Sequence, residues 1–103
     1  MDSDYIRTIH ADWKEAVART VVFERWRCGL SQLSLARGMG AYRTTVCRTE
    51  NAKLCRMPTL ESIERLARAL NVAPWDFVLT IEARALLISI RRTRRAERLQ
   101  KAS

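Results

Sequence analysis

The spacing of apolar residues along the chain predicts a series of amphipathic helices. Between Asp12 and Gly29, apolar residues recur every three or four positions, which is the period of a helix with one buried face. Asp12 is a candidate N-cap of this helix, and Gly29 is a stop signal beyond its end. The same spacing continues upstream, so the segment 4–11 either extends this helix or forms a separate short one. The repeating positions are Trp13, Ala16, Val17, Thr20, Val21 and Trp26.

Two short helices with a glycine-containing turn between them are predicted next. Ser31 is a candidate cap for a helix over 32–37, which the stretch 38–40 ends. A second helix runs from about Arg43 to position 50 or 51. The side chains expected to be partly buried in the first of these helices are Leu33, Leu35 and Ala36. Two helices joined in this way form a helix-turn-helix, whose second helix can enter a DNA major groove.

The clearest amphipathic pattern follows a predicted loop at 51–58. Thr59 is a candidate N-cap, and Asn71 suits a left-handed position at the end of the helix. The apolar residues that share one face of this helix are Leu60, Ile63, Leu66, Ala67 and Leu70.

The last part of the chain predicts one more helix. Pro74 is tolerated in the first turn of a helix, and no glycine or further proline follows it. The segment 86–90 also has the composition of a strand, but the longer pattern favours one continuous helix. We therefore expect an all-α fold.

Positive charge is concentrated in two parts of the chain. The net charge is +8 over 103 residues. The block 25–57 has a net charge of +6, and the block 91–103 has a net charge of +5. The blocks 1–24 and 58–90 carry −2 and −1. This distribution favours a surface that binds a polyanion, with nucleic acid as the first candidate and an anionic membrane as the second.

Composition also bounds the cellular setting. A chain of this length has room for one compact core. The three cysteines, Cys28, Cys47 and Cys55, cannot all pair within one chain, and no apolar N-terminal stretch suggests a signal peptide. Glu82 and Arg84 interrupt the most apolar segment, so no membrane span is expected. We expect a cytoplasmic, reduced protein.

Motifs for catalysis are missing from the sequence. His10 is the only histidine, and no paired carboxylates, glycine-rich phosphate loop or zinc-type cysteine spacing accompany it. We expect no enzyme activity, no metal and no cofactor. A redox sensor based on Cys47 or Cys55 is a minor alternative.

A set of these residues resembles the Cro and phage-repressor helix-turn-helix family, often called Xre-type. The resemblance covers about 21–78 and rests on a combination of short motifs. The residues that carry it are Gly29-Leu30-Ser31-Gln32, Leu35-Ala36, Gly40, Val46, Glu50, Pro58-Thr59-Leu60 and Leu66-Ala67-Arg68-Ala69-Leu70-Asn71-Val72. The resemblance implies a five-helix, all-α domain that binds operator DNA as a two-fold dimer, with its third helix in the major groove.

The resemblance also implies roles for individual residues. Gln32 matches a glutamine that contacts a phosphate or braces the recognition helix, whereas Asn51 and Lys53 fall where the family touches phosphates. The outward recognition positions are Arg43, Thr44, Thr45 and Cys47, and the inward positions are Val46 and Thr49. The departures from the pattern are Tyr42 in place of a small capping residue, Thr49 in place of an apolar one, Ala52 in place of glycine, and a longer loop over 52–57.

Helical spacing supports the same division of residues without the resemblance. The residues on one side are Arg43, Thr44, Cys47 and Arg48, and Val46 and Thr49 lie on the other. Arginine can bind guanine through two hydrogen bonds, and threonine can bond a base or a phosphate. Arg48, Lys53 and Arg56 suit phosphates, which set affinity and register. The predicted DNA-binding site consists of Gln32, Tyr42, Arg43, Thr44, Thr45, Cys47, Arg48, Asn51 and Lys53.

The chain is therefore divided into three parts. We expect 1–20 to form an N-terminal extension and the start of helix one, 21–78 to form the DNA-binding domain, and 79–103 to form a dimerisation segment with a basic helical tail. The large side chains of 79–90 exceed what the core of so small a domain needs, which favours a homodimer interface over additional intramolecular core as their location. The tail at 91–95 suits contact with DNA, contact with RNA, or solvent.

The predicted function is sequence-specific binding of duplex DNA by a transcriptional regulator, either a repressor or a self-regulating controller. An antitoxin-type protein, which also neutralises a small toxin partner, is the main alternative. A module that binds only proteins or RNA is the third.

Overall fold

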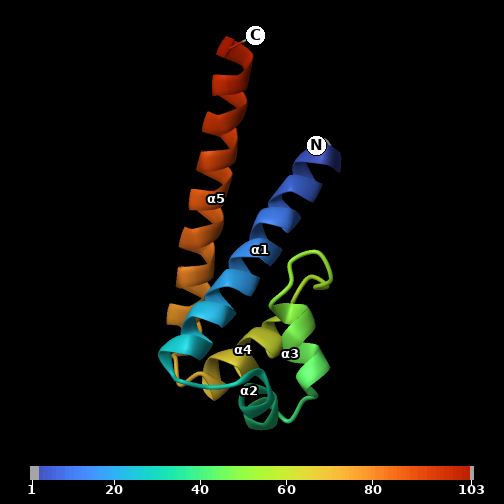
Figure 1. The fold of residues 1–103 in the computed structure, drawn as a ribbon, viewed down its shortest axis with the longest axis vertical. Coiled ribbons are helices and arrows are strands. Elements are labelled where there is room, and N and C mark those ends of the chain that lie inside the picture. Colours follow the sequence, from blue (N-terminus) through green and yellow to red (C-terminus); the bar gives the residue numbers. More distant parts are fainter. Residues whose placement is uncertain (1–2, 103) are drawn as a thin grey trace.

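Five α-helices and no strand make up residues 3–102, the part of the chain that the computed structural model describes, with side chains from residue 7 onward (Figure 1). The helices are α1 (Ser3–Arg27), α2 (Gln32–Met39), α3 (Arg43–Thr49), α4 (Leu60–Ala69) and α5 (Pro74–Ala102). The predicted all-α class is confirmed, and so is the preference for a helix over a strand at 86–90.

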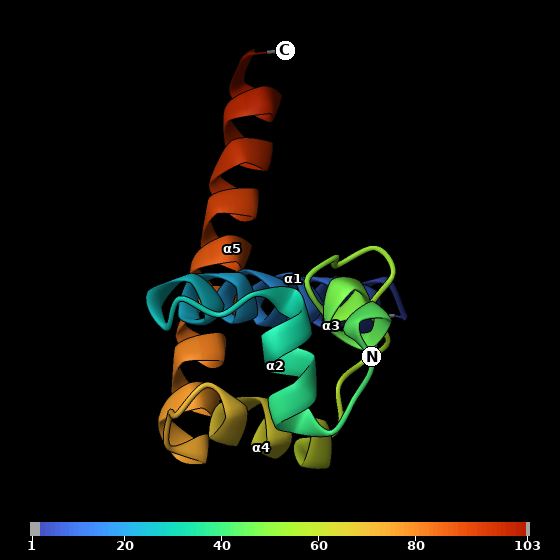
Figure 2. The same ribbon diagram turned by 60° about the horizontal axis from the view of Figure 1, so that its bottom comes forward.

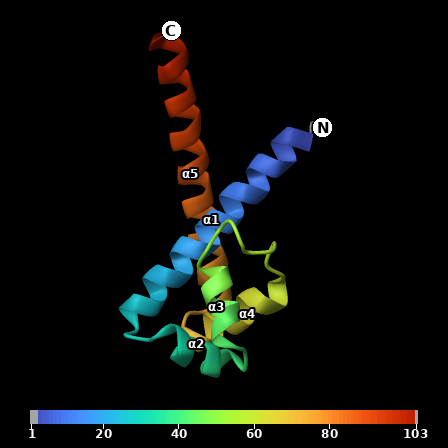
Figure 3. The same ribbon diagram turned by 45° about the vertical axis from the view of Figure 1, so that its right-hand side comes forward.

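The two long helices, α1 and α5, cross and then diverge (Figures 1 and 3). The three short helices gather around one end of this crossed pair, where α2 packs against both α3 and α4 (Figure 2). The molecule measures 50 × 27 × 24 Å. It is elongated because the 29 residues of α5 span about 44 Å at the usual helical rise, well beyond the short helices.

A single apolar core holds the five helices together. Its buried residues are Ala16, Val17, Val21, Leu35, Ala36, Val46, Ile63, Leu66, Ala67, Leu70, Phe77, Ile81 and Ile88. Isolated helices as short as α2 and α3 are unstable in water, so their burial through Leu35, Ala36 and Val46 keeps them helical.

The prediction that Asp12 caps the first helix is wrong. α1 is continuous from Ser3, so the segment 4–11 is its N-terminal extension, and Asp12 lies inside the helix. The side chain of Asp12 is buried, and Arg92 of α5 pairs with it at 2.7 Å between Nη1 and Oδ1. The packing of α5 against α1 therefore uses this carboxylate for a tertiary ion pair, which a rule based on neighbouring residues does not reveal.

The other predicted helix ends are close to those observed. Ser31 and Thr59 cap α2 and α4 by accepting hydrogen bonds from the backbone N of Ser34 and Ser62, at 3.0 and 3.1 Å. Asn71 has the predicted left-handed conformation, with φ at 57°. These ends depend on local side-chain chemistry, which explains why the sequence predicts them.

α2 runs further than predicted, through Gly38 to Met39, and ends at Gly40 with φ at 67°. A Cβ atom at Gly38 would lie 3.4 Å from the Cβ of Ala69, so Gly38 allows α2 to pass close to α4. The glycine serves packing there, and only Gly40 ends the helix.

Three apolar side chains that the helical pattern assigned to inner faces are exposed. Their exposed fractions are 70% for Trp26, 43% for Leu33 and 80% for Leu60. Each lies on a helix that supplies buried residues to the core, but no neighbouring element in residues 3–102 covers these three positions. The spacing predicts the direction of a side chain and not what lies against it.

The boundaries predicted at 20/21 and 78/79 fall inside α1 and α5. Both long helices therefore begin or end in the terminal segments and run without interruption into the core. The terminal segments are continuations of core helices, and their orientation is set by the crossing of α1 and α5.

Candidate nucleic-acid interface

Helices α2 and α3 are joined by a short turn whose geometry follows from local chemistry. Ser31 begins α2, and the left-handed Gly40 ends it and lets the chain turn. The N–H of Ala41 closes the turn on the carbonyl of Ala36 at 2.9 Å. Tyr42 then occupies the N-cap of α3 without a side-chain cap hydrogen bond, as expected for a bulky residue at a position that favours small polar ones.

The surface of α3 is polar and basic, and it is open to solvent. Val46 alone is fully buried, and Thr49 is half-buried, with its hydroxyl donating to the carbonyl of Thr45 at 2.8 Å. The exposed residues of this region are Tyr42, Arg43, Thr44, Thr45, Cys47 and Arg48. Side chains with hydrogen-bond donors, acceptors and positive charge therefore project from one short helix that is fixed on its opposite side.

Glu50, directly after α3, joins three helices. It accepts hydrogen bonds from Nε and Nη2 of Arg25 on α1, at 2.6 and 3.0 Å, in a two-point ion pair. Gln32 at the start of α2 donates a third bond to Glu50 at 3.0 Å, and Arg25 also donates to the carbonyl of Leu30. The network fixes the end of α3 relative to α1 and α2.

The resemblance implied that Gln32 contacts a phosphate or braces the recognition helix, and the structure places its side chain against Glu50, directly after α3. The amide nitrogen of Gln32 donates a hydrogen bond to Glu50. Arg25 also donates to Glu50, and this hydrogen bond raises the pKa of Arg25. The guanidinium of Arg25 therefore stays charged.

Asn51 and Lys53 lie in the loop after α3, and both are exposed. The side-chain oxygen of Asn51 accepts from the backbone N of Lys53 at 3.0 Å, which orders the first turn of the loop. The structure thus brings these two residues to the C-terminal end of α3, while Arg43 and Thr44 lie at its N-terminal end. The loop also carries Arg56 beside Arg48, where both line a shallow hollow next to α4.

Sequence reasoning missed Arg25 as a residue of this region. Arg25 stands 25 positions before Glu50, and periodicity assigned it no role. One signal was present: Glu50 is the single acidic residue in the basic block 25–57, which made a partner within that block a reasonable guess.

The cysteines differ in exposure. Cys28 and Cys47 are exposed, whereas Cys55 is buried and its Sγ donates to the carbonyl of Arg56 at 3.0 Å. Burial raises the pKa of the Cys55 thiol, although nearby Lys14 partly opposes this. Cys55 is therefore protonated and poorly reactive, which disfavours it as a redox sensor.

No cluster of ligating side chains suitable for a metal ion is found within residues 3–102. In the same part of the chain, no helix has both the length and the apolar character needed to span a membrane. No known protein family matches the chain, and no curated protein is significantly similar to it.

Proposed function

We propose that this protein is a transcriptional regulator that binds duplex DNA at specific sequences, as a repressor or a self-regulating controller. The observation that carries the proposal is the braced α3 helix, with Arg43, Thr44 and Cys47 exposed and with no acidic side chain among its seven residues. An exposed helix of this kind, held from behind by a second helix, suits insertion into a major groove. The sequence resemblance to Xre-type regulators supports the same function.

Phosphate contacts would come from the C-terminal end of α3 and the loop that follows it. Arg48, Lys53 and Arg56 are exposed cations close to α3, and none of them forms an ion pair within the described residues. Because such residues release counterions from DNA when they bind, they would supply affinity without sequence preference.

A homodimer is part of the proposal, because one short helix reads only a few base pairs. α5 carries an apolar stripe on the side turned away from the core residues Phe77, Ile81 and Ile88. The stripe consists of Leu79, Leu86 and Ile90, with Leu87 at its edge beside Ile88, and Leu79 and Leu86 are about 60% exposed. A two-fold contact between the stripes of two copies would bury these side chains and present two α3 helices to one duplex.

The experiment that tests the proposal is a salt titration of binding to mixed-sequence duplex DNA, followed by fluorescence anisotropy. The logarithm of affinity should fall linearly with the logarithm of salt concentration, with a slope of about −0.9 per phosphate neutralised. No binding at low salt, or binding that salt does not weaken, would contradict the proposal.

A further inference from the structure

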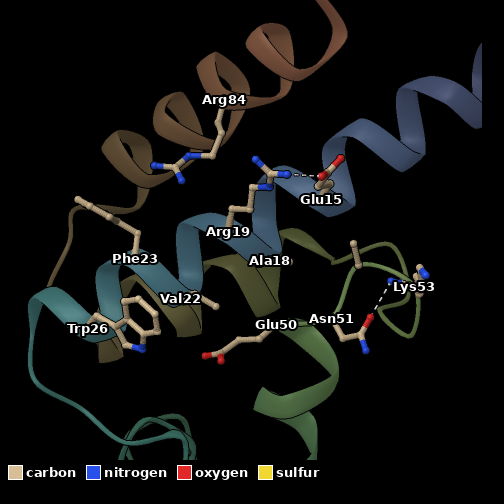
Figure 4. A pocket seen from close by; sticks show the side chains of 11 residues that line it. Glu15, Ala18, Arg19, Val22, Phe23, Trp26, Glu50, Asn51, Lys53 and Arg84 are labelled. Carbon is tan, nitrogen blue, oxygen red and sulfur yellow. Dashed lines mark hydrogen bonds and ion pairs between the residues drawn. The ribbon is translucent and has the colours of Figure 1, made fainter. Parts of the chain in front are cut away.

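An open hollow of about 700 Å³ lies between α1, α5 and the loop after α3. Figure 4 shows residues that line it: Phe23 and Trp26 project from α1, Arg84 reaches from α5, and Asn51 and Lys53 border the far end. A second hollow of about 460 Å³ shares Arg19 and Arg84 with the first and continues along α5 to Arg91. The two hollows adjoin at these two shared side chains and are together called here the α1–α5 groove.

The floor of the α1–α5 groove is apolar and aromatic. Phe23 and Trp26 are 53% and 70% exposed, although both lie on the helix that supplies much of the core. The guanidinium of Arg84 lies 5.6 Å from the centre of the Phe23 ring, close enough for a cation–π contact. Exposed aromatic residues gathered with arginine are typical of the centre of a protein–protein interface.

The rim of the groove is positively charged. Its two carboxylates are already engaged, since Glu15 pairs with Arg19 at 2.7 Å and Glu50 pairs with Arg25. Within the described residues, Arg84 and Lys53 form no ion pair, and neither does Arg91 in the second hollow. The groove therefore offers unpaired cations around an apolar floor.

We propose that the α1–α5 groove binds an acidic amphipathic helix of a partner protein. The apolar face of such a helix would cover Phe23 and Trp26, and its carboxylates would meet Arg84 and Arg91. Duplex DNA fits less well, because phosphates gain nothing from an exposed aromatic floor. The inference does not depend on DNA binding by α3, although Asn51 and Lys53 border both surfaces.

The test uses the full chain and two labelled peptides of about 18 residues, long enough to form a helix when bound. Both peptides carry leucines on one helical face. One has glutamates on the other face, and the second has lysines in their place. Binding is followed by fluorescence anisotropy, and circular dichroism checks that each protein variant is folded.

The glutamate peptide should bind, and the lysine peptide should bind at least about tenfold more weakly. The affinity for the glutamate peptide should fall about tenfold in each of three variants, Trp26→Ala, Arg84→Glu and Arg91→Glu. Trp75→Ala and Arg98→Glu are the matched controls: both side chains are exposed and lie outside the groove, so their loss should change binding by less than about twofold.

Four results would overturn the proposal. The first is that neither peptide binds, and the second is that the lysine peptide binds as well as the glutamate peptide. The third is that Trp75→Ala and Arg98→Glu weaken binding as much as Trp26→Ala and Arg84→Glu do, which would show general attraction to a basic protein. The fourth is that Trp26→Ala converts a dimer into a monomer in sedimentation, or that it lowers the affinity for duplex DNA as much as the affinity for the peptide. Either outcome would assign the groove to another partner.

Discussion

Glu50 shows how one residue can fix the end of α3 relative to two other helices. Its carboxylate is 7% exposed and holds Arg25, which is 13% exposed, while Gln32 adds a third hydrogen bond. Glu50→Ala would leave a largely buried guanidinium without its partner, and such a loss costs about 3–5 kcal/mol in free energy of unfolding. Urea denaturation followed by circular dichroism measures this loss.

Glu61→Ala is the matched control, because Glu61 pairs with Arg65 at 2.8 Å on the open surface of α4. Exposed pairs of this kind contribute between nothing and about 1 kcal/mol. Similar costs for Glu50→Ala and Glu61→Ala would show that the Glu50 network is not what holds α3 in place.

Asp12 is expected to make the free energy of unfolding decrease as pH rises. Burial raises its pKa from the ordinary value of 3.8, Glu15 adds to the rise, and Arg92 opposes it. The folded protein therefore holds this proton more tightly than the unfolded chain does. The resulting stabilisation is complete below the pKa that Asp12 has in the unfolded chain. It is lost as pH rises through the pKa that Asp12 has in the folded protein.

Asp12→Asn removes this titration and keeps the shape of the side chain. The variant should be more stable than the wild type at pH 7, and the difference should shrink as pH falls toward the unfolded pKa of Asp12. Urea denaturation at several pH values measures the difference. A variant that is less stable at pH 7 would show that the Arg92 ion pair outweighs the cost of burying the carboxylate.

At the scale of elements, the sequence predicts the parts of the fold that depend on neighbouring residues. Ser31, Thr59 and Asn71 end or begin helices through their own side chains or backbone, and all three were assigned correctly. Asp12 and Leu60 were misassigned because their surroundings depend on which helix packs against them. The Arg25–Glu50 pair was missed for the same reason, since it joins residues that only the folded chain brings together.

The apolar stripe of α5 leads to a prediction about assembly. Replacing Leu86 and Leu87 by glutamate should produce a monomer that stays helical, because both side chains are more than half exposed and add little to the core. The monomer should keep weak, salt-sensitive DNA binding and lose most of its affinity for a palindromic site. Sedimentation of the wild type and the variant measures the change. A monomeric wild type, or a variant that remains dimeric, would contradict this interface, and an unfolded variant would assign the two leucines to the core.

At the scale of the whole molecule, the two ends of the chain project away from the short helices. α5 continues past its crossing with α1 (Figure 1), and residues 91–102 are exposed, with six of the twelve basic. Arg92 pairs with Asp12, so this ion pair ties the first turn of the tail to α1. The basic tail and the exposed face of α3 are therefore separate positive surfaces, and α3 is the helix proposed to read the DNA sequence.

Selection of bound duplexes from a random DNA pool tests that claim most directly. The wild type should enrich a palindrome with two half-sites whose centres lie about 10 base pairs, or one helical turn, apart. Arg43→Ala should still bind but lose its preference at one base pair in each half-site, at a cost of about 1–3 kcal/mol. A pool that shows no enriched sequence, or an enriched sequence that Arg43→Ala leaves unchanged, would contradict the assignment of α3 as the helix that reads DNA.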